Sequence, residues 1–265
     1  MGHTRLGLIP KSRRWTAVVD RVLEELPIGG PISSDVLAIS DKTIAAAEGA
    51  IQSAVSDPGL RYTFYLLTKV ILASRERNWA KELQDLGLNI SAASGIMDLT
   101  CELQSRVDDC LGHSQRRTDI GEMAQKAAGE TLAALVGAKT PDFFEQGSEQ
   151  VRLALKDYAT SKGFGSLGQK FFGSFMTKFM NFYLSRITAA HLGIKKIGQI
   201  GDIVEFNDAL RLHCEQSARI VRDFCGQWVS KTEFEEGITE QNVGRFVAVA
   251  VTKLKAELKV QKEQK

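Results

Sequence analysis

The chain has 265 residues, of which 43% are hydrophobic and 25% are charged, and its formal net charge is +2. This composition is that of an ordinary globular protein with a substantial core, and it excludes a polyelectrolyte that binds anions over its whole surface. The first residues, MGHTRLGLIPKSRRW, have no apolar signal region, and no apolar run is long enough to span a membrane. The four cysteines are too few for a secreted disulfide framework. We therefore expect a cytoplasmic protein.

Apolar residues recur at helical spacing along the whole chain. The stripes predict helices, in chain order, over residues 15–26, 44–55, 58–71, 79–86, 96–110, 124–135, 141–155, 171–187, 206–224 and 243–258. Asp57–Pro58 and Thr140–Pro141 are each a capping residue followed by proline, which is a signal for a helix start. Gly87 follows an apolar stripe and is expected to end a helix.

These patterns predict an all-α protein, a multi-helix bundle of about ten helices. No stretch shows the alternation of a β-strand, and all five prolines lie at or before residue 141, at predicted helix boundaries. We expect a single helical domain over residues 1–265. If it consists of two lobes, the division falls near residue 140, although no low-complexity linker marks it.

The segment that begins at Gly163 matches a dinucleotide-binding pattern in its letters, GFGSLG. That pattern holds a pyrophosphate only where a strand leads into the turn and a helix follows it. Because the preceding residues, VRLALKDYATSK, are helical in pattern, we expect a glycine loop between two helices and no cofactor.

An amphipathic helix follows over residues 166–190. Its apolar half is bulky and aromatic, and comprises Phe171, Phe172, Phe175, Met176, Phe179, Met180, Phe182, Tyr183 and Ile187. The favoured interpretation is a bundle helix whose aromatic face is core. The two alternatives are a helix that lies on a membrane surface and a face that docks to a partner.

Charge is distributed unevenly. No acidic residue occurs between Asp157 and Asp202, whereas this interval contains Lys162, Lys170, Lys178, Arg186, Lys195 and Lys196. A partner protein or a nucleic acid is therefore expected to bind these six residues, unless acidic helices, such as the one with Asp108 and Asp109, neutralise them.

Histidine and cysteine patterns do not predict a metal site, and His213, Cys214 and Cys225 fall on or near an apolar stripe, so we expect them in the core. Arg186 and His191 form an Arg-x4-His pattern, and Arg106 and His113 form Arg-x6-His. Both resemble the Arg-x4-6-His signature of HEPN-type ribonucleases. The resemblance implies a helical dimer in which the histidine transfers protons and the arginine stabilises charge on the phosphorane, without metal. Arg186 is expected to point into the aromatic face.

Three stretches, TRLGLIPKSRRWTAVVD, TDIGEMAQKAAGETLAALVG and HCEQSARIVRDFCGQWVSK, look similar to bacterial proteins, which implies a bacterial cytoplasmic origin. The favoured function is a non-enzymatic accessory or interaction subunit of a bacterial multi-protein system, of which a defence system is one kind. It would dock to a protein or a nucleic acid through residues 158–201. The first alternative is a HEPN-like endoribonuclease that uses Arg186 and His191, and the second is a membrane-surface protein, which we do not favour.

Overall fold

The computed structural model describes residues 3–4, 11–24, 32–113, 117–139, 147–194 and 197–260. Twelve α-helices lie in these ranges: α1 (Arg13–Leu23), α2 (Val36–Ala46), α3 (Glu48–Ser56), α4 (Pro58–Ala73), α5 (Trp79–Asp85), α6 (Ile96–His113), α7 (Asp119–Gly137), α8 (Ser148–Lys156), α9 (Ser161–Ala190), α10 (Ile200–Ser217), α11 (Arg219–Glu235) and α12 (Glu240–Val260). Two 3-10 helices, Ile32–Asp35 and Asp157–Ala159, connect longer elements. The all-α prediction is confirmed, with two more helices than the ten stripes indicated.

Strand structure within the described residues is limited to one short parallel pair, β1 (His3–Thr4) and β2 (Arg117–Thr118). His3 is in register with Arg117, and Thr4 with Thr118. Two residues per strand do not form a layer, so the architecture remains helix packed on helix.

Two predicted helix ends, at Asp57–Pro58 and at Gly87, agree with the structure. The Asp57 carboxylate accepts a hydrogen bond from the backbone N–H of Leu60 at 2.8 Å, and Pro58 is the first helical residue. Gly87 has φ of +80° just after α5, the conformation that glycine tolerates best. Thr140–Pro141 lies outside the described residues, and the described helix begins at Ser148.

Three of the predicted boundaries are wrong. The stripe over 44–55 spans two helices, because α2 ends at Ala46 and α3 starts at Glu48. The stripe over 206–224 spans two helices, because α10 ends at Ser217 and α11 starts at Arg219 after a single intervening residue. The glycines between Gly163 and Gly168 do not form a loop but belong to the first turns of α9. Thr160 caps this helix, since its hydroxyl accepts from the N–H of Gly163 at 3.1 Å.

Close packing explains why glycines occur inside α9. A Cβ on Gly165 would lie 2.6 Å from the Arg222 carbonyl oxygen, and one on Gly168 would lie 2.5 Å from the Cys225 sulfur. Both neighbours belong to α11. The absence of side chains therefore lets α9 and α11 approach each other. These glycines are explained by helix packing and not by the predicted loop.

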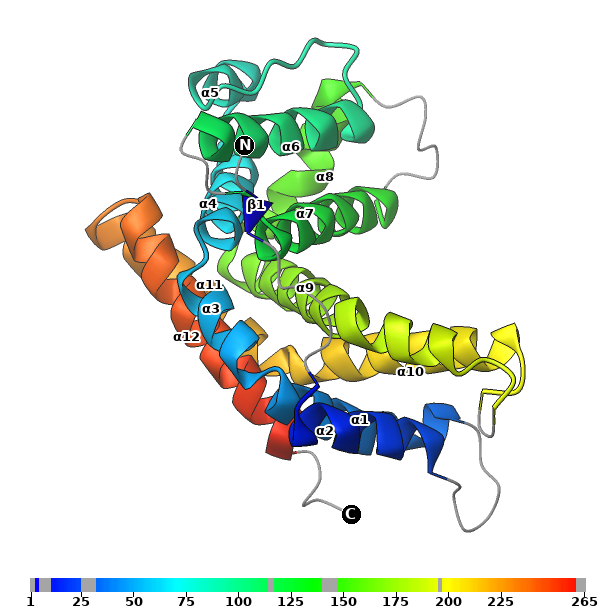
Figure 1. Ribbon diagram of the computed structural model, residues 1–265. Helices are drawn as coiled ribbons and strands as arrows, with labels where there is room; N and C mark the ends of the chain where they lie inside the picture. The colour runs from blue at the N-terminus through cyan, green and yellow to red at the C-terminus, as the bar shows by residue number, and fades with distance from the viewer. Residues whose placement is uncertain are drawn as a thin grey trace.

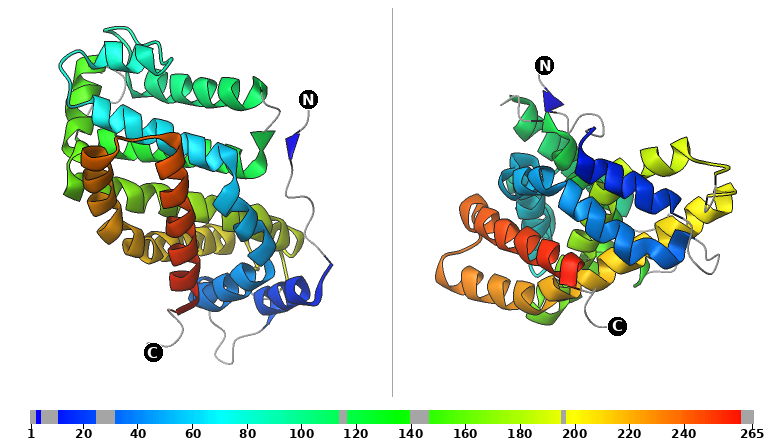
Figure 2. Two further views of the ribbon diagram at one scale, coloured as in Figure 1. Left: turned by 90° about the vertical axis from the view of Figure 1, so that its left-hand side faces the viewer. Right: turned by 60° about the horizontal axis from the view of Figure 1, so that its bottom comes forward.

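The helix α9 runs through the middle of the molecule (Figure 1). Its 30 residues contact α11 along one side, α7 along another and α10 along a third. Helix α12 crosses the outside of α4, α3 and α2 (Figure 2). Helix α7, which precedes residue 140, packs on α9, which follows it.

The aromatic face of α9 is core, as favoured from the sequence. Its large apolar side chains from Phe171 to Ile187 are buried except Phe182, which is half-buried. Phe64 of α4 packs against three rings of α9, at centroid distances of 6.3 Å to Phe164, 5.0 Å to Phe171 and 5.1 Å to Phe172. Burial of His213, Cys214 and Cys225 is likewise confirmed.

Candidate partner-binding surface

The predicted basic residues do not form one patch. Lys162, Lys170, Lys178 and Arg186 follow one another at intervals of eight along α9. An interval of eight residues rotates a position by about 80° around a helix, so these side chains wind around α9 instead of sharing a face. Lys195 and Lys196 lie outside the described residues.

Lys178 is neutralised by an acid from a neighbouring helix. Its ammonium group forms an ion pair with the Glu130 carboxylate of α7, and the Ser174 hydroxyl donates to the same carboxylate at 2.6 Å. The expected kind of neutralisation therefore occurs, but at Glu130, whereas Asp108 accepts from the Gln125 amide at 3.0 Å. Lys162 and Lys170 are exposed.

Arg186 does not point into the buried face, and this expectation is wrong. The residue is exposed, and its guanidinium carbon lies 4.4 Å from the centroid of the Phe182 ring, one turn earlier. Helical side chains lean toward the preceding turn, which places Arg186 over the half-buried ring at the margin of the face. Burial raises the pKa of the neighbouring Tyr183 hydroxyl, and the positive charge of Arg186 partly opposes that rise.

His191 caps the end of α9. Its Nδ1 lies 2.7 Å from the Ile187 carbonyl oxygen, and a neutral ring must carry its proton on Nδ1 to donate there. His191 lies five positions after Arg186 in the chain. This step corresponds to a rotation of about 140° around a helix, so the two side chains leave α9 in different directions. No group of three potential metal ligands occurs in the part of the chain that the structure describes.

Aliphatic side chains are concentrated on the surface where α9 turns into α10. We define the α9–α10 tip as residues 191–194 and 197–204, at the outer edge of the molecule (Figure 1). Leu192, Ile194, Ile200 and Val204 are 43%, 46%, 69% and 55% exposed, respectively. They are four of the nine large hydrophobic residues that are well exposed among the described residues. An apolar patch of this kind on a surface commonly marks an interaction site.

The backbone of the tip is held by hydrogen bonds. The Gly193 N–H donates to the Ile197 carbonyl at 2.6 Å, and the Ile197 N–H donates to the Ile194 carbonyl at 3.1 Å. Gly193 has φ of +83°, and the fully buried Ile197 anchors the turn in the core. Leu192 and Ile194 are thus next to hydrogen-bonded backbone, and Ile200 and Val204 lie in the first turns of α10.

The exposure of these four residues is not predictable from the sequence pattern. Its residues are ordinary core formers, and only their place in a glycine-containing connector set them apart from the helical stripes. Exposure itself depends on which helices cover the connector, and that information lies elsewhere in the chain.

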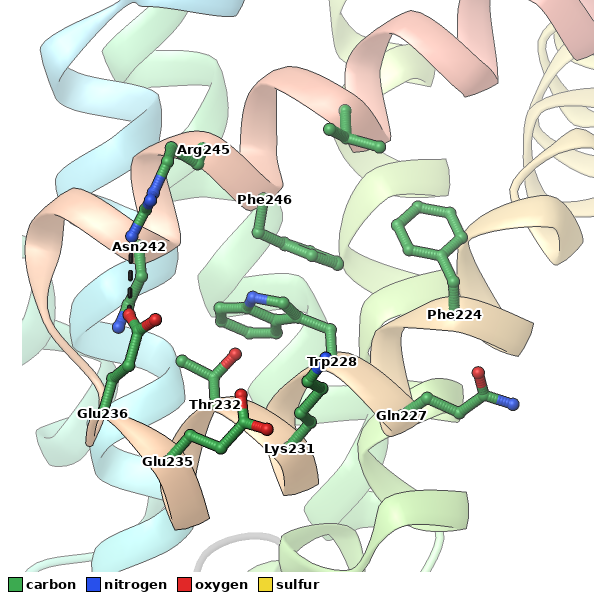
Figure 3. A pocket seen from close by; sticks show the side chains of 11 residues that line it. Phe224, Gln227, Trp228, Lys231, Thr232, Glu235, Glu236, Asn242, Arg245 and Phe246 are labelled. Carbon is green, nitrogen blue, oxygen red and sulfur yellow. Dashed lines mark hydrogen bonds and ion pairs between the residues drawn. The ribbon is translucent and has the colours of Figure 1, made fainter.

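A hollow of about 520 Å³ lies between α11 and α12 (Figure 3). Its floor is aromatic: the Trp228 and Phe246 rings stack at 4.2 Å, and Phe224 lies 5.4 Å from Phe246. These rings bind one another and hold the two helices together. The charged residues around it, Lys231, Arg245, Glu235 and Glu236, are balanced in sign, so the hollow does not favour a charged partner.

None of the described helices is long and apolar enough to cross a bilayer. Except for the half-buried Phe182, the large apolar side chains of the 166–190 helix are packed inside the bundle. Comparisons of the chain with family models, with curated proteins and with solved structures found no match.

Proposed function

We propose that this chain is a non-enzymatic interaction subunit, and that the α9–α10 tip docks on a partner protein. The single observation that supports the proposal is the exposure of Leu192, Ile194, Ile200 and Val204, which lie just after the end of α9 and in the first turns of α10. The bacterial, cytoplasmic multi-protein system expected from the sequence is the proposed setting.

The tip supplies binding energy through its apolar side chains. Full burial of one large aliphatic side chain stabilises a complex by about 1.5 to 3 kcal/mol. Each of these four side chains is between 43% and 69% exposed in the free chain. Removing them from water at a partner's surface recovers part of this energy. A small apolar centre of this kind, with polar residues around it, is typical of protein interfaces.

The charges near the tip indicate which residues should surround the apolar patch on the partner. Between residues 186 and 204 the sequence contains three basic residues, Arg186, Lys195 and Lys196, and one acidic residue, Asp202. Acidic groups around the partner's apolar patch would therefore speed association and fix the register. We commit to a protein partner of this character.

Replacing Ile194 and Ile200 together by serine tests the proposal. Proteins captured from a lysate by the wild-type chain are first identified, and the affinity of each purified candidate is then measured. We expect the double variant to bind the true partner at least about tenfold more weakly, because truncation at an interface centre commonly costs more than 1 kcal/mol. We also expect the affinity to fall as salt rises.

The matched control replaces Met97 and Leu153, which are 55% and 52% exposed on other helices, by serine. It should bind as the wild type does. Equal weakening by both double variants would contradict docking at the tip. The wild type is also tested for binding to anionic vesicles, to RNA and to itself. If one of these interactions is lost only in the tip variant, that ligand, and not a partner protein, binds the tip.

The endoribonuclease alternative gives a separate prediction. Because Arg186 and His191 leave different sides of α9 and the His191 Nδ1 contacts the Ile187 carbonyl oxygen, we expect purified protein to leave labelled RNA intact. Cleavage that is lost in both Arg186→Ala and His191→Ala, with the helical circular dichroism spectrum unchanged, would contradict the non-enzymatic assignment. A dimer that pairs these residues across subunits would then be sought by sedimentation.

A further inference from the structure

A groove with a volume of about 580 Å³ lies between α7, α9 and α10. Its size falls in the range of small-molecule sites, which is about 300 to 1,000 Å³. The groove shares two helices with the tip, but none of the four exposed aliphatic residues lines it. What binds in it is therefore a question separate from partner docking.

The groove has cations without counter-ions. Four basic and three acidic residues line it: Lys126, Lys170, Lys178, Arg211, Glu130, Asp208 and Glu215. All three acids are already paired, Glu130 with Lys178, and Asp208 and Glu215 with Arg211 at 3.8 and 3.2 Å. Lys126 of α7 and Lys170 of α9 form no ion pair or hydrogen bond with any residue that the structure describes. Each of two walls of the groove thus has one lysine without a counter-ion among the described residues.

Buried polar atoms without partners also line the groove. The Thr131 side chain is 2% exposed, and neither its hydroxyl nor the buried Asn181 Oδ1 has a hydrogen-bond partner among the described residues. Buried polar groups in proteins are nearly always hydrogen-bonded, so both atoms require an explanation.

Helical threonines use their hydroxyls in two ways. The hydroxyls of Thr43, Thr68, Thr177, Thr188 and Thr252 each donate to the carbonyl four residues earlier, at 2.7 to 3.0 Å. Thr131, like Thr63 of α4, forms no such bond among the described residues, and Thr131 lines a groove that also contains two lysines without an ion pair.

We infer that this groove binds a small phosphorylated molecule, with Lys126 and Lys170 on the phosphoryl group and Thr131 and Asn181 hydrogen-bonding to the ligand. Lysine is a compact point charge suited to phosphate, whereas planar carboxylates are better matched by the arginine fork. Met123 and Phe182 supply apolar wall for the rest of the ligand. A nucleic-acid strand is disfavoured, because it needs a longer track of cations.

Titration with inorganic phosphate, pyrophosphate, adenosine monophosphate and uncharged adenosine tests the inference, with calorimetry for affinity and amide shifts in NMR for location. We expect at least one phosphorylated probe to bind with Kd below about 1 mM and to shift amides of α7 and α9 beside the groove. Adenosine should not bind. The Lys126→Ala/Lys170→Ala variant should bind at least about tenfold more weakly, because two charge-assisted hydrogen bonds are lost.

Two matched variants separate binding from folding. Lys162→Ala removes an exposed lysine of α9 outside the groove and should leave affinity unchanged. Thr131→Val should weaken binding without lowering the melting temperature, since its hydroxyl has no partner to lose, whereas Thr68→Val removes a real hydrogen bond and should lower it. Failure of all phosphorylated probes, equal binding of adenosine, or unchanged affinity in the double lysine variant would overturn the inference.

Discussion

Replacing Phe175 by alanine is expected to lower the free energy of unfolding by about 3 to 5 kcal/mol. The side chain is 1% exposed, and its ring packs 6.5 Å from that of Phe179 on the buried face of α9. Removing it leaves a cavity in the helix that contacts α7, α10 and α11, so few neighbours are free to collapse inward. Urea unfolding followed by circular dichroism measures the change.

Phe234 is the matched control, because its side chain is 92% exposed at the end of α11. Its replacement by alanine should change stability by no more than about 0.5 kcal/mol. Equal effects of the two variants would mean that the aromatic face of α9 is not the core of the folded protein.

The helical architecture was predictable because local signals and burial agree. The nine bulky residues of the α9 face lie on one half of a helix, and eight of them are buried. Capping chemistry is similarly local, so Asp57 and Gly87 mark helix ends in the sequence as well as in the structure. These features need only a few neighbouring residues to be recognised.

The glycines of α9 were misassigned because glycine has two structural uses. In sequence, Gly163, Gly165 and Gly168 resemble a turn, since glycine weakens a helix by up to about 1 kcal/mol. In the structure, α11 lies against Gly165 and Gly168, and glycine is required there for the contact of the two helices, whereas a Cβ on Gly163 would lie 2.1 Å from the Asp157 carbonyl oxygen. The deciding residues, Arg222 and Cys225, occur more than fifty positions later, beyond the reach of any local pattern.

The candidate sites were only partly predictable for the same reason. The absence of acids over 158–201 is visible in sequence, but the pairing of Lys178 with Glu130 joins residues 48 positions apart. That contact divides the predicted basic set into a neutralised lysine, an available Lys170 in the groove, and Arg186 over Phe182. The uneven distribution of charge raised the possibility of an anionic partner, whereas only packing reveals the exposed aliphatic residues of the tip and the groove with two lysines that lack an ion pair.

Replacing Gly226 by alanine should destabilise the protein, although alanine is the better helix former. A Cβ at this position of α11 would lie 2.1 Å from the Ser161 carbonyl oxygen in the first turn of α9. Because the obstacle is backbone, relief requires the two helices to separate along an extensive contact. Overpacking of this kind costs about 1 to 3 kcal/mol, occasionally more, and it exceeds the helix-propensity gain of about 1 kcal/mol.

Gly49 provides a control with the opposite expected sign. It lies in α3, and a Cβ there would meet no atom within 4 Å apart from those of its own turn. Gly49→Ala should therefore raise the free energy of unfolding by up to about 1 kcal/mol, through helix propensity alone. Thermal unfolding of the two variants beside the wild type gives the comparison. If Gly226→Ala raised the free energy of unfolding as Gly49→Ala is expected to, the close approach of α9 and α11 would be contradicted. The glycines at the start of α9 would then have no packing explanation.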